Sequence, residues 1–233
     1  MQRILVLISV LALILSGTAY GQLAPAIGYM FPPGGQAGTS VEVTLGGYDW
    51  TPDMQIFVHD PRITLELLAP PGPIIVPEPP YWFGKKARRP PFLLPRETKA
   101  RLTVPADVPP GLIGWQVANA NGASAVGQFE ISGDPQVIET DGRREPQTLE
   151  SLPIVIAGQI KHIEEVDEYR ITATKTGSIT CTLRSRKIGT ELNAVLEVRN
   201  AARKPVASTA DTAGYDTALT FHAESGQSYV LRL

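Results

Sequence analysis

The three histidines are the residues that a catalytic site would use most readily, and none has the neighbours that catalysis requires. His162 is followed by Ile-Glu-Glu and lacks the second histidine of a zinc-protease helix. His59 and His222 stand alone, and His222 lies in a strand-like segment. The sequence contains no Gly-x-Ser-x-Gly elbow, no phosphate-binding glycine loop and no CxxC pair. The pattern therefore predicts a protein that is not an enzyme.

A second group of residues has side chains suited to binding a partner. Three consecutive aromatic residues are followed closely by four cations, and the group comprises Tyr81, Trp82, Phe83, Lys85, Lys86, Arg88 and Arg89. Aromatic rings exposed beside cations are suited to contact a glycan, an anionic polymer or a protein. In the alternative interpretation, the rings pack this segment back onto the protein while the charges stay in water. We expect any partner, a cell-envelope polysaccharide or an exported protein, to bind here first.

These aromatic and basic residues lie in a proline-rich segment, residues 69–98. Nine prolines fall between Pro70 and Pro95, which favours extended backbone and disfavours regular central strands. We therefore predict that residues 69–98 are an insertion between two strands of a sheet.

Charge and cysteine content narrow the classes of partner and fold. The formal net charge is −2, so no overall basic field attracts nucleic acid, and we expect no nucleic-acid partner. The single cysteine, Cys181, rules out a disulfide framework within the chain. Because Cys181 alternates with polar residues, we expect it to be a buried thiol on a strand.

Residues 1–21 have the organisation of a signal peptide. Arg3 precedes an apolar run from Ile4 to Leu15, and Ala19 and Gly21 are the small residues of a cleavage site. A membrane span needs about 20 apolar residues, so this run is too short to be an anchor. We expect export to the periplasm, the cell surface or the medium, with no membrane span after cleavage.

The rest of the chain reads as short strands separated by glycine and proline turns. In residues 40–45, for example, Val41, Val43 and Leu45 alternate with polar residues and share one face. Sustained helical periodicity is absent from the sequence of the first half. A turn at residues 133–135, followed by a polar connector over residues 136–150, divides the chain into two modules. The sequence predicts an all-β protein of two tandem β-sandwiches, residues 22–134 and 135–233, after the signal peptide.

The first module resembles a known family of immunoglobulin-like domains. Residues 27–47 contain Pro-Gly-Gly-Gln-x-Gly-Thr-x-Val-x-Val-x-Leu-x-Gly, and Val104-Pro-Ala-Asp-Val-Pro-Pro-Gly follows later. These segments are similar to the two halves of an IPT/TIG-type domain. The resemblance implies an immunoglobulin-like sandwich that binds or acts as a spacer and does not catalyse.

The second module resembles the bacterial pre-peptidase C-terminal (PPC) domain, a jelly-roll-like sandwich. The resemblance rests on Pro153-Ile-Val-Ile-Ala-Gly, Asp167-x-Tyr-x-Ile-x-Ala, Leu192-x-Ala-x-Leu-x-Val and Gly226-x-x-Tyr-Val-Leu. Period-two alternation independently predicts seven inward-facing side chains, which are Tyr169, Ile171, Leu196, Val198, Leu219, Phe221 and Tyr229. An IPT-like unit followed by a PPC-like unit resembles exported proteins of planctomycete-type bacteria.

The PPC resemblance also implies a metal hypothesis. Some relatives of this sandwich bind calcium through acidic residues, and the candidates here are Glu139, Asp141, Asp167, Asp211 and Asp216. Calcium requires six to eight converging oxygens, and Asn193 replaces an acidic residue of the family pattern. In the alternative interpretation these are surface carboxylates at strand ends. Apart from calcium, we expect no cofactor.

Together these observations predict an exported, non-catalytic binding or spacer protein of the cell envelope or the extracellular space. The alternative is the N-terminal accessory portion of a larger exported enzyme such as a protease, because Leu233 falls within an apparent strand.

Overall fold

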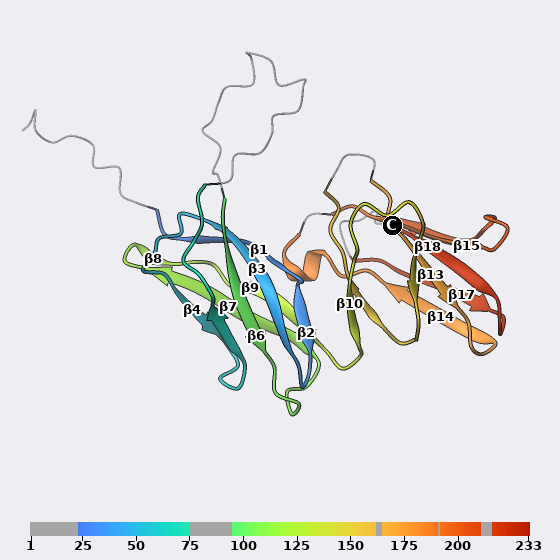
Figure 1. Cartoon of the computed structure of the whole chain (residues 1–233), viewed down its shortest axis with the longest axis horizontal. Coiled ribbons are helices and arrows are strands. Elements are labelled where there is room, and N and C mark those ends of the chain that lie inside the picture. The colour runs from blue at the N-terminus through green and yellow to red at the C-terminus, as the bar shows by residue number, and fades with distance from the viewer. Residues whose placement is uncertain (1–22, 75–94, 162–164, 191, 211–215) are drawn as a thin grey trace, which may run out of the picture.

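The computed structural model describes residues 23–74, 95–161, 165–190, 192–210 and 216–233 (Figure 1). Over these residues the regular structure consists of β-strands and one short 3-10 turn, η1 (Arg186–Ile188). The chain is all-β and its sheets pack as β-sandwiches, as the sequence predicts. The described residues contain no helix that is long and apolar enough to cross a membrane.

The first module is a sandwich of two sheets. One sheet has the strand order β1-β3-β6-β5 and the other β2-β9-β7-β4, with β8 paired to β7. The pairs are antiparallel except β2 with β9, which is parallel. The strands are β1 (Ala26–Phe31), β2 (Gly34–Gln36), β3 (Ser40–Tyr48), β4 (Gln55–Val58), β5 (Thr64–Leu67), β6 (Arg96–Thr103), β7 (Gly111–Asn119), β8 (Gly122–Ala123) and β9 (Gly127–Ser132).

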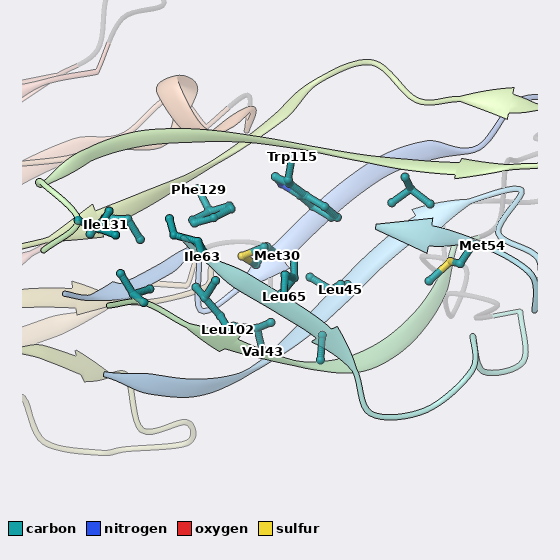
Figure 2. Close-up of a cluster of buried hydrophobic side chains, with 14 of the residues drawn as sticks. Met30, Val43, Leu45, Met54, Ile63, Leu65, Leu102, Trp115, Phe129 and Ile131 are labelled. Carbon is teal, nitrogen blue, oxygen red and sulfur yellow. The ribbon is translucent and has the colours of Figure 1, made fainter. Parts of the chain in front are cut away.

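The core of the first module lies between these two sheets. Figure 2 shows Trp115 of β7 and Phe129 of β9 facing Val43 and Leu102 of the opposite sheet. All four side chains are buried, because strand alternation directs every second residue inward. The predicted inward face of β3 is confirmed at Val43 and Leu45, and Val41 is partly buried against the same core.

The end of the proline-rich insertion differs from the prediction. Strand β6 begins at Arg96, so residues 96–98 belong to the sheet and not to the insertion. Thr98 is buried, and its hydroxyl donates a hydrogen bond of 2.5 Å to the carbonyl of Ala69. This hydrogen bond satisfies the buried hydroxyl, which is why a polar residue is tolerated at an inward position.

The second module has a separate core and three groups of strands. The larger sheet has the order β11-β13-β18-β15-β16, and β14 pairs with β17 and β10 with β12. All seven side chains predicted to face inward are buried. Cys181 is partly buried against this core, and burial raises the pKa of its thiol. The strands are β10 (Gln136–Ile138), β11 (Gln147–Leu149), β12 (Val155–Ala157), β13 (Glu168–Thr172), β14 (Gly177–Thr182), β15 (Val195–Asn200), β16 (Pro205–Ala210), β17 (Ala218–Ala223) and β18 (Ser228–Arg232).

Residues 136–150 are more ordered than the predicted polar connector. They contain β10 and β11, which pair in parallel with β12 and β13 of the second module. Alternation could not reveal these strands because each has only three residues, and each contributes a single apolar side chain to the core, Val137 in β10 and Leu149 in β11. The connector is therefore part of the second module.

The two modules meet directly. Strand β9 ends at Ser132 and β10 begins at Gln136, and the Ser132 hydroxyl accepts a hydrogen bond of 2.9 Å from the Asp134 amide. Arg184 of the second module forms an ion pair with Glu130 of β9, and η1 lies against the same strand. Figure 1 shows η1 beside the strands of the first module.

Candidate functional site: an acidic cavity in the second module

A cavity of about 260 Å³ opens between the loop that follows β10 and the loop that leads into β13. Glu139, Asp141 and Arg143 line one side of the cavity, and Glu165 and Asp167 line the other. The fold thus brings three of the five proposed calcium ligands, Glu139, Asp141 and Asp167, to one place.

Glu139 and Asp167 form a buried pair of carboxyl groups in this cavity. The Glu139 side chain is 6% exposed, and Asp167 is 7% exposed. Glu139 Oε2 accepts a hydrogen bond of 3.1 Å from the Gln159 amide, and the Glu139 carboxyl lies close enough to Asp167 to raise its pKa. Asp167 Oδ2 has no hydrogen-bond partner within the described part of the chain. An unsatisfied buried carboxylate oxygen is costly, so this atom is the point where a cation or proton would be stabilised.

Gly158 allows this close packing. A Cβ atom at position 158 would lie 2.7 Å from Glu139 Oε2 and 2.9 Å from the Tyr169 hydroxyl. Any side chain there would push the carboxylate or the phenol aside, so the pair requires glycine at this position.

The pair holds a proton near neutral pH. Burial, together with the neighbouring Glu139 carboxyl and the charge of Glu165, raises the pKa of Asp167 to about 7. The Arg143 guanidinium opposes this shift without cancelling it. Burial, reinforced by the charges of Glu139 and Asp167, also raises the pKa of the Tyr169 phenol above its ordinary value.

Arg143 fastens the loop over the carboxyl pair. Its Nη2 atom lies 3.2 Å from Glu139 Oε1, and its Nε and Nη1 atoms donate hydrogen bonds of 2.5 Å and 3.2 Å to the carbonyls of Thr140 and Glu168. The guanidinium also stacks on Tyr169, 5.6 Å from the ring centroid. One arginine therefore neutralises Glu139 and ties the connector to β13.

Asp141 lines the same cavity but is directed to a different partner. Its carboxylate lies 2.5 Å from Lys161 Nζ, and both side chains are substantially exposed. The Lys161 amide donates a hydrogen bond to the Glu165 carboxylate. Asp141 therefore forms a rim ion pair and is not a third member of the buried carboxyl pair.

Asp216 does not line the cavity, and its hydrogen bonds give it a structural role. Its carboxylate accepts hydrogen bonds from the amides of Ser185 and Arg186, both at 2.8 Å, and of Lys187 at 3.3 Å. Burial acts to raise the pKa of Asp216, but these hydrogen bonds outweigh it and the pKa is lowered. Asn193 accepts a hydrogen bond from the Arg186 side chain near this turn. Asp216 thus holds η1 in place, and Asp211 lies outside the described residues.

The residues around the cavity partly meet the requirements of calcium. No group of three histidine, cysteine, aspartate or glutamate side chains is arranged to hold a metal in the described ranges. Glu139 and Asp167 would supply two converging carboxylates, and the unpartnered Asp167 oxygen is suited to a cation. Calcium requires more oxygens than these two residues provide. The calcium hypothesis stays a prediction, with Glu139 and Asp167 as its most favourable ligands.

Millimolar calcium is expected to raise the thermal midpoint of the second module, because a cation bound only in the folded state stabilises it by mass action. Differential scanning calorimetry with and without calcium measures this shift. The Asp167→Asn variant should lose the shift, and Asp216→Asn should keep it. An unchanged midpoint for the unsubstituted protein would remove the metal site.

Sequence reasoning missed several residues of this site, among them Arg143 and Glu165 in the cavity wall, Lys161 at its rim, and Tyr169 in its polar role. Tyr169 was predicted only as an inward core residue, and its hydroxyl is near Glu139. Nothing in the run Gly142-Arg143-Arg144 distinguishes the arginine that is held in the fold from its neighbour. The proposed recognition residues Tyr81, Trp82, Phe83, Lys85, Lys86, Arg88 and Arg89 lie outside the described residues, as does His162.

Comparisons with known proteins add little to this description. No protein-family model and no curated protein matches the chain. Among solved structures, the adhesin InvE of Yersinia pseudotuberculosis is similar, with 12% sequence identity and a TM-score of 0.26. The match covers 90% of this chain and 55% of that chain. A TM-score this low does not establish a shared fold. The protein belongs to the class of all-β proteins built from β-sandwich modules, and this assignment rests on its own sheets and cores.

Proposed function

We propose that this protein is an exported, non-catalytic binding or spacer protein that presents two β-sandwich modules in a fixed relative orientation. The observation that carries the proposal is the direct contact between the modules. A flexible linker of many residues would allow the modules to reorient freely. Here only residues 133–135 separate β9 from β10.

Three local features support a fixed orientation. The Ser132 hydroxyl is hydrogen-bonded to both the amide and the carbonyl of Asp134, which orders the connection. The ion pair of Arg184 with Glu130 joins the modules at a second point. Asp216 holds the turn that lies against β9, so this second contact is built on an ordered segment. Two contact points restrict rotation more than one connection does.

The proposal of export rests on the sequence. Residues 1–21 have the three regions of a signal peptide, and they lie outside the described residues. A chain with a single cysteine gains no disulfide stabilisation outside the cell, so stability depends on the two hydrophobic cores.

Charge reversal at the module contact tests the proposal. Glu130→Arg places two cations together, and we expect the modules to separate, since facing like charges are repulsive. Small-angle scattering should show a broader range of dimensions, and nuclear relaxation should give each module its own rotational correlation time. The unsubstituted protein should tumble as one body.

Two controls make this test specific. Glu66→Arg reverses an exposed charge on β5 and should change neither measurement. The double exchange Glu130→Arg with Arg184→Glu restores opposite charges and should restore common tumbling. Independent tumbling of the two modules in the unsubstituted protein would refute the fixed spacer.

A further inference from the structure

The two outer faces of the first module differ in charge. The outer face of β3, β5 and β6 carries the charged residues Glu42, Glu66, Glu97, Lys99 and Arg101. Along β4, β7 and β9, all of which the structure describes in full, Glu130 is the one charged outward residue. Glu130 is neutralised by Arg184. A solvent-facing sheet normally carries charges, so this uncharged face calls for an explanation.

Apolar side chains are exposed on the uncharged face. Phe57 is 49% exposed, Val126 51% and Leu112 39%. Phe57 pairs directly with Gln116 across β4 and β7, and Val126 immediately precedes Gly127, which pairs with Trp115. Phe57 of β4, Gln116 of β7 and Val126, which directly precedes β9, therefore lie side by side in one row across the sheet.

The neighbouring row consists of His59, Gly114 and Gln128, and hydrogen bonds fix the position of its His59 side chain. The His59 amide donates to the Gly114 carbonyl at 2.9 Å, and Gly114 pairs with Gln128. The His59 ring lies directly over Gly114, because a Cβ atom at that position would be 2.5 Å from His59 Nδ1. His59 Nε2 is 3.0 Å from Gln116 Oε1, and Gln116 Nε2 donates to the Ser124 carbonyl at 2.8 Å. These bonds hold the ring in place against the sheet before any ligand arrives, which lowers the entropic cost of binding.

The chemistry of this face suits an uncharged sugar polymer. The apolar side of a sugar ring packs on an aromatic ring such as Phe57, while amide and imidazole groups bind hydroxyls. An anionic polymer would find no cation on these two rows to compensate its charge.

The face of these three strands is smaller than a standard protein interface. Three strands at ~4.8 Å spacing, over the ~20 Å from Leu112 to Ala118, present roughly 200–300 Å². A standard protein interface buries about 800 Å² on each partner. The Arg184 contact and η1 already occupy the face at its Glu130 end, which bounds the open area on that side. The area accommodates a few sugar rings.

We propose that the outer face of β4, β7 and β9 binds an uncharged polysaccharide segment, with Phe57 and His59 as the stacking residues and Gln116 and Gln128 at the hydroxyl groups. This inference rests on the proposed binding function and names its ligand class. The site is separate from the aromatic and basic group of the proline-rich segment.

Titration of the full chain with uncharged hexasaccharides tests the proposal. The probes are cellohexaose, mannohexaose and chitohexaose, and amide chemical shifts of the protein report the site. We expect at least one probe to shift resonances of β4, β7 and β9 in a saturable manner. The double variant Phe57→Ala with His59→Ala should bind at least about ten-fold more weakly, since stacking anchors dominate small interfaces.

A matched variant on the other sheet is the control. Thr64→Ala with Glu66→Ala alters two outward positions of β5, which is also an edge strand, and should bind within about two-fold of the unsubstituted protein. Gln128→Glu, a single exposed substitution, should weaken binding without loss of fold. Absence of saturable shifts with all three probes would overturn the proposal, as would equal binding by the double variant. Neither result bears on whether the two modules tumble together, so the proposed spacer function would still stand.

Discussion

Replacing Phe129 by alanine is expected to destabilise the first module by about 3–5 kcal/mol while the unfolding transition of the second module stays in place. Phe129 is fully buried among the residues of the first core, and its removal leaves a cavity that the β-sandwich closes only in part. The second core shares no residue with the first. The effect should therefore be confined to one of two calorimetric transitions.

The matched variant is Phe221→Ala. Phe221 is buried in the second core, and its ring centroid lies 5.0 Å from that of Tyr229. This substitution should lower the second transition and spare the first. A single transition that moves equally in both variants would mean that the two cores unfold as one cooperative unit.

Raising the pH from about 5 to about 8 is expected to destabilise the second module by about 1–2 kcal/mol through Asp167. The pKa of Asp167 is about 7 in the folded protein, above its ordinary value of 3.8. The folded state therefore binds the proton more tightly, and stability falls as the pH rises between these two values. The effect is smaller than the full shift implies, because the carboxyl pair borders a cavity open to water.

Asp167→Asn should remove this pH dependence, because the amide is uncharged throughout the range. At pH 8 the variant should be the more stable protein, and urea denaturation of the second module across the pH range measures the difference. Arg143, Glu139 and Glu165 remain in the variant, so the difference between the two pH profiles isolates Asp167. Parallel pH profiles for the two proteins would contradict the assignment.

Asp216 provides an internal control of opposite sign. Its pKa is lowered by amide hydrogen bonds, so its contribution is present above its ordinary pKa and is lost as the pH falls. Asp216→Asn should therefore weaken the module at neutral pH, where Asp167→Asn strengthens it. Variants of these two residues separate a carboxylate that anchors a turn from one that shares a proton.

Alternation predicted the strands that carry apolar side chains on one face. The seven inward residues of the second module and the inward face of β3 follow directly from period two. Strands β10 and β11 escaped prediction because parallel pairing with β12 and β13 orders them, and no local pattern encodes such a partner.

The candidate site was only partly accessible from sequence. Glu139 and Asp167 were named as acidic candidates, but their proximity depends on the path of the connector over β13. Asp141 and Asp216 have the same chemistry and face other partners. The uncharged face of β4, β7 and β9 was missed because it becomes visible only when the register places Phe57 beside Gln116.

The parallel strands of the connector, β10 and β11, determine where the chain can be cut to give a separate second module. A second module expressed from Ser151 onward would keep the strands foreseen from its sequence but lose β10 and β11. The edge of β13 that pairs with β11 would then be bare, and Asp167 would lose Glu139 and Arg143 together. Uncovered edges recruit strands from other molecules, so this fragment should aggregate. A fragment that begins at Pro135 should stay monodisperse, and gel filtration distinguishes the two.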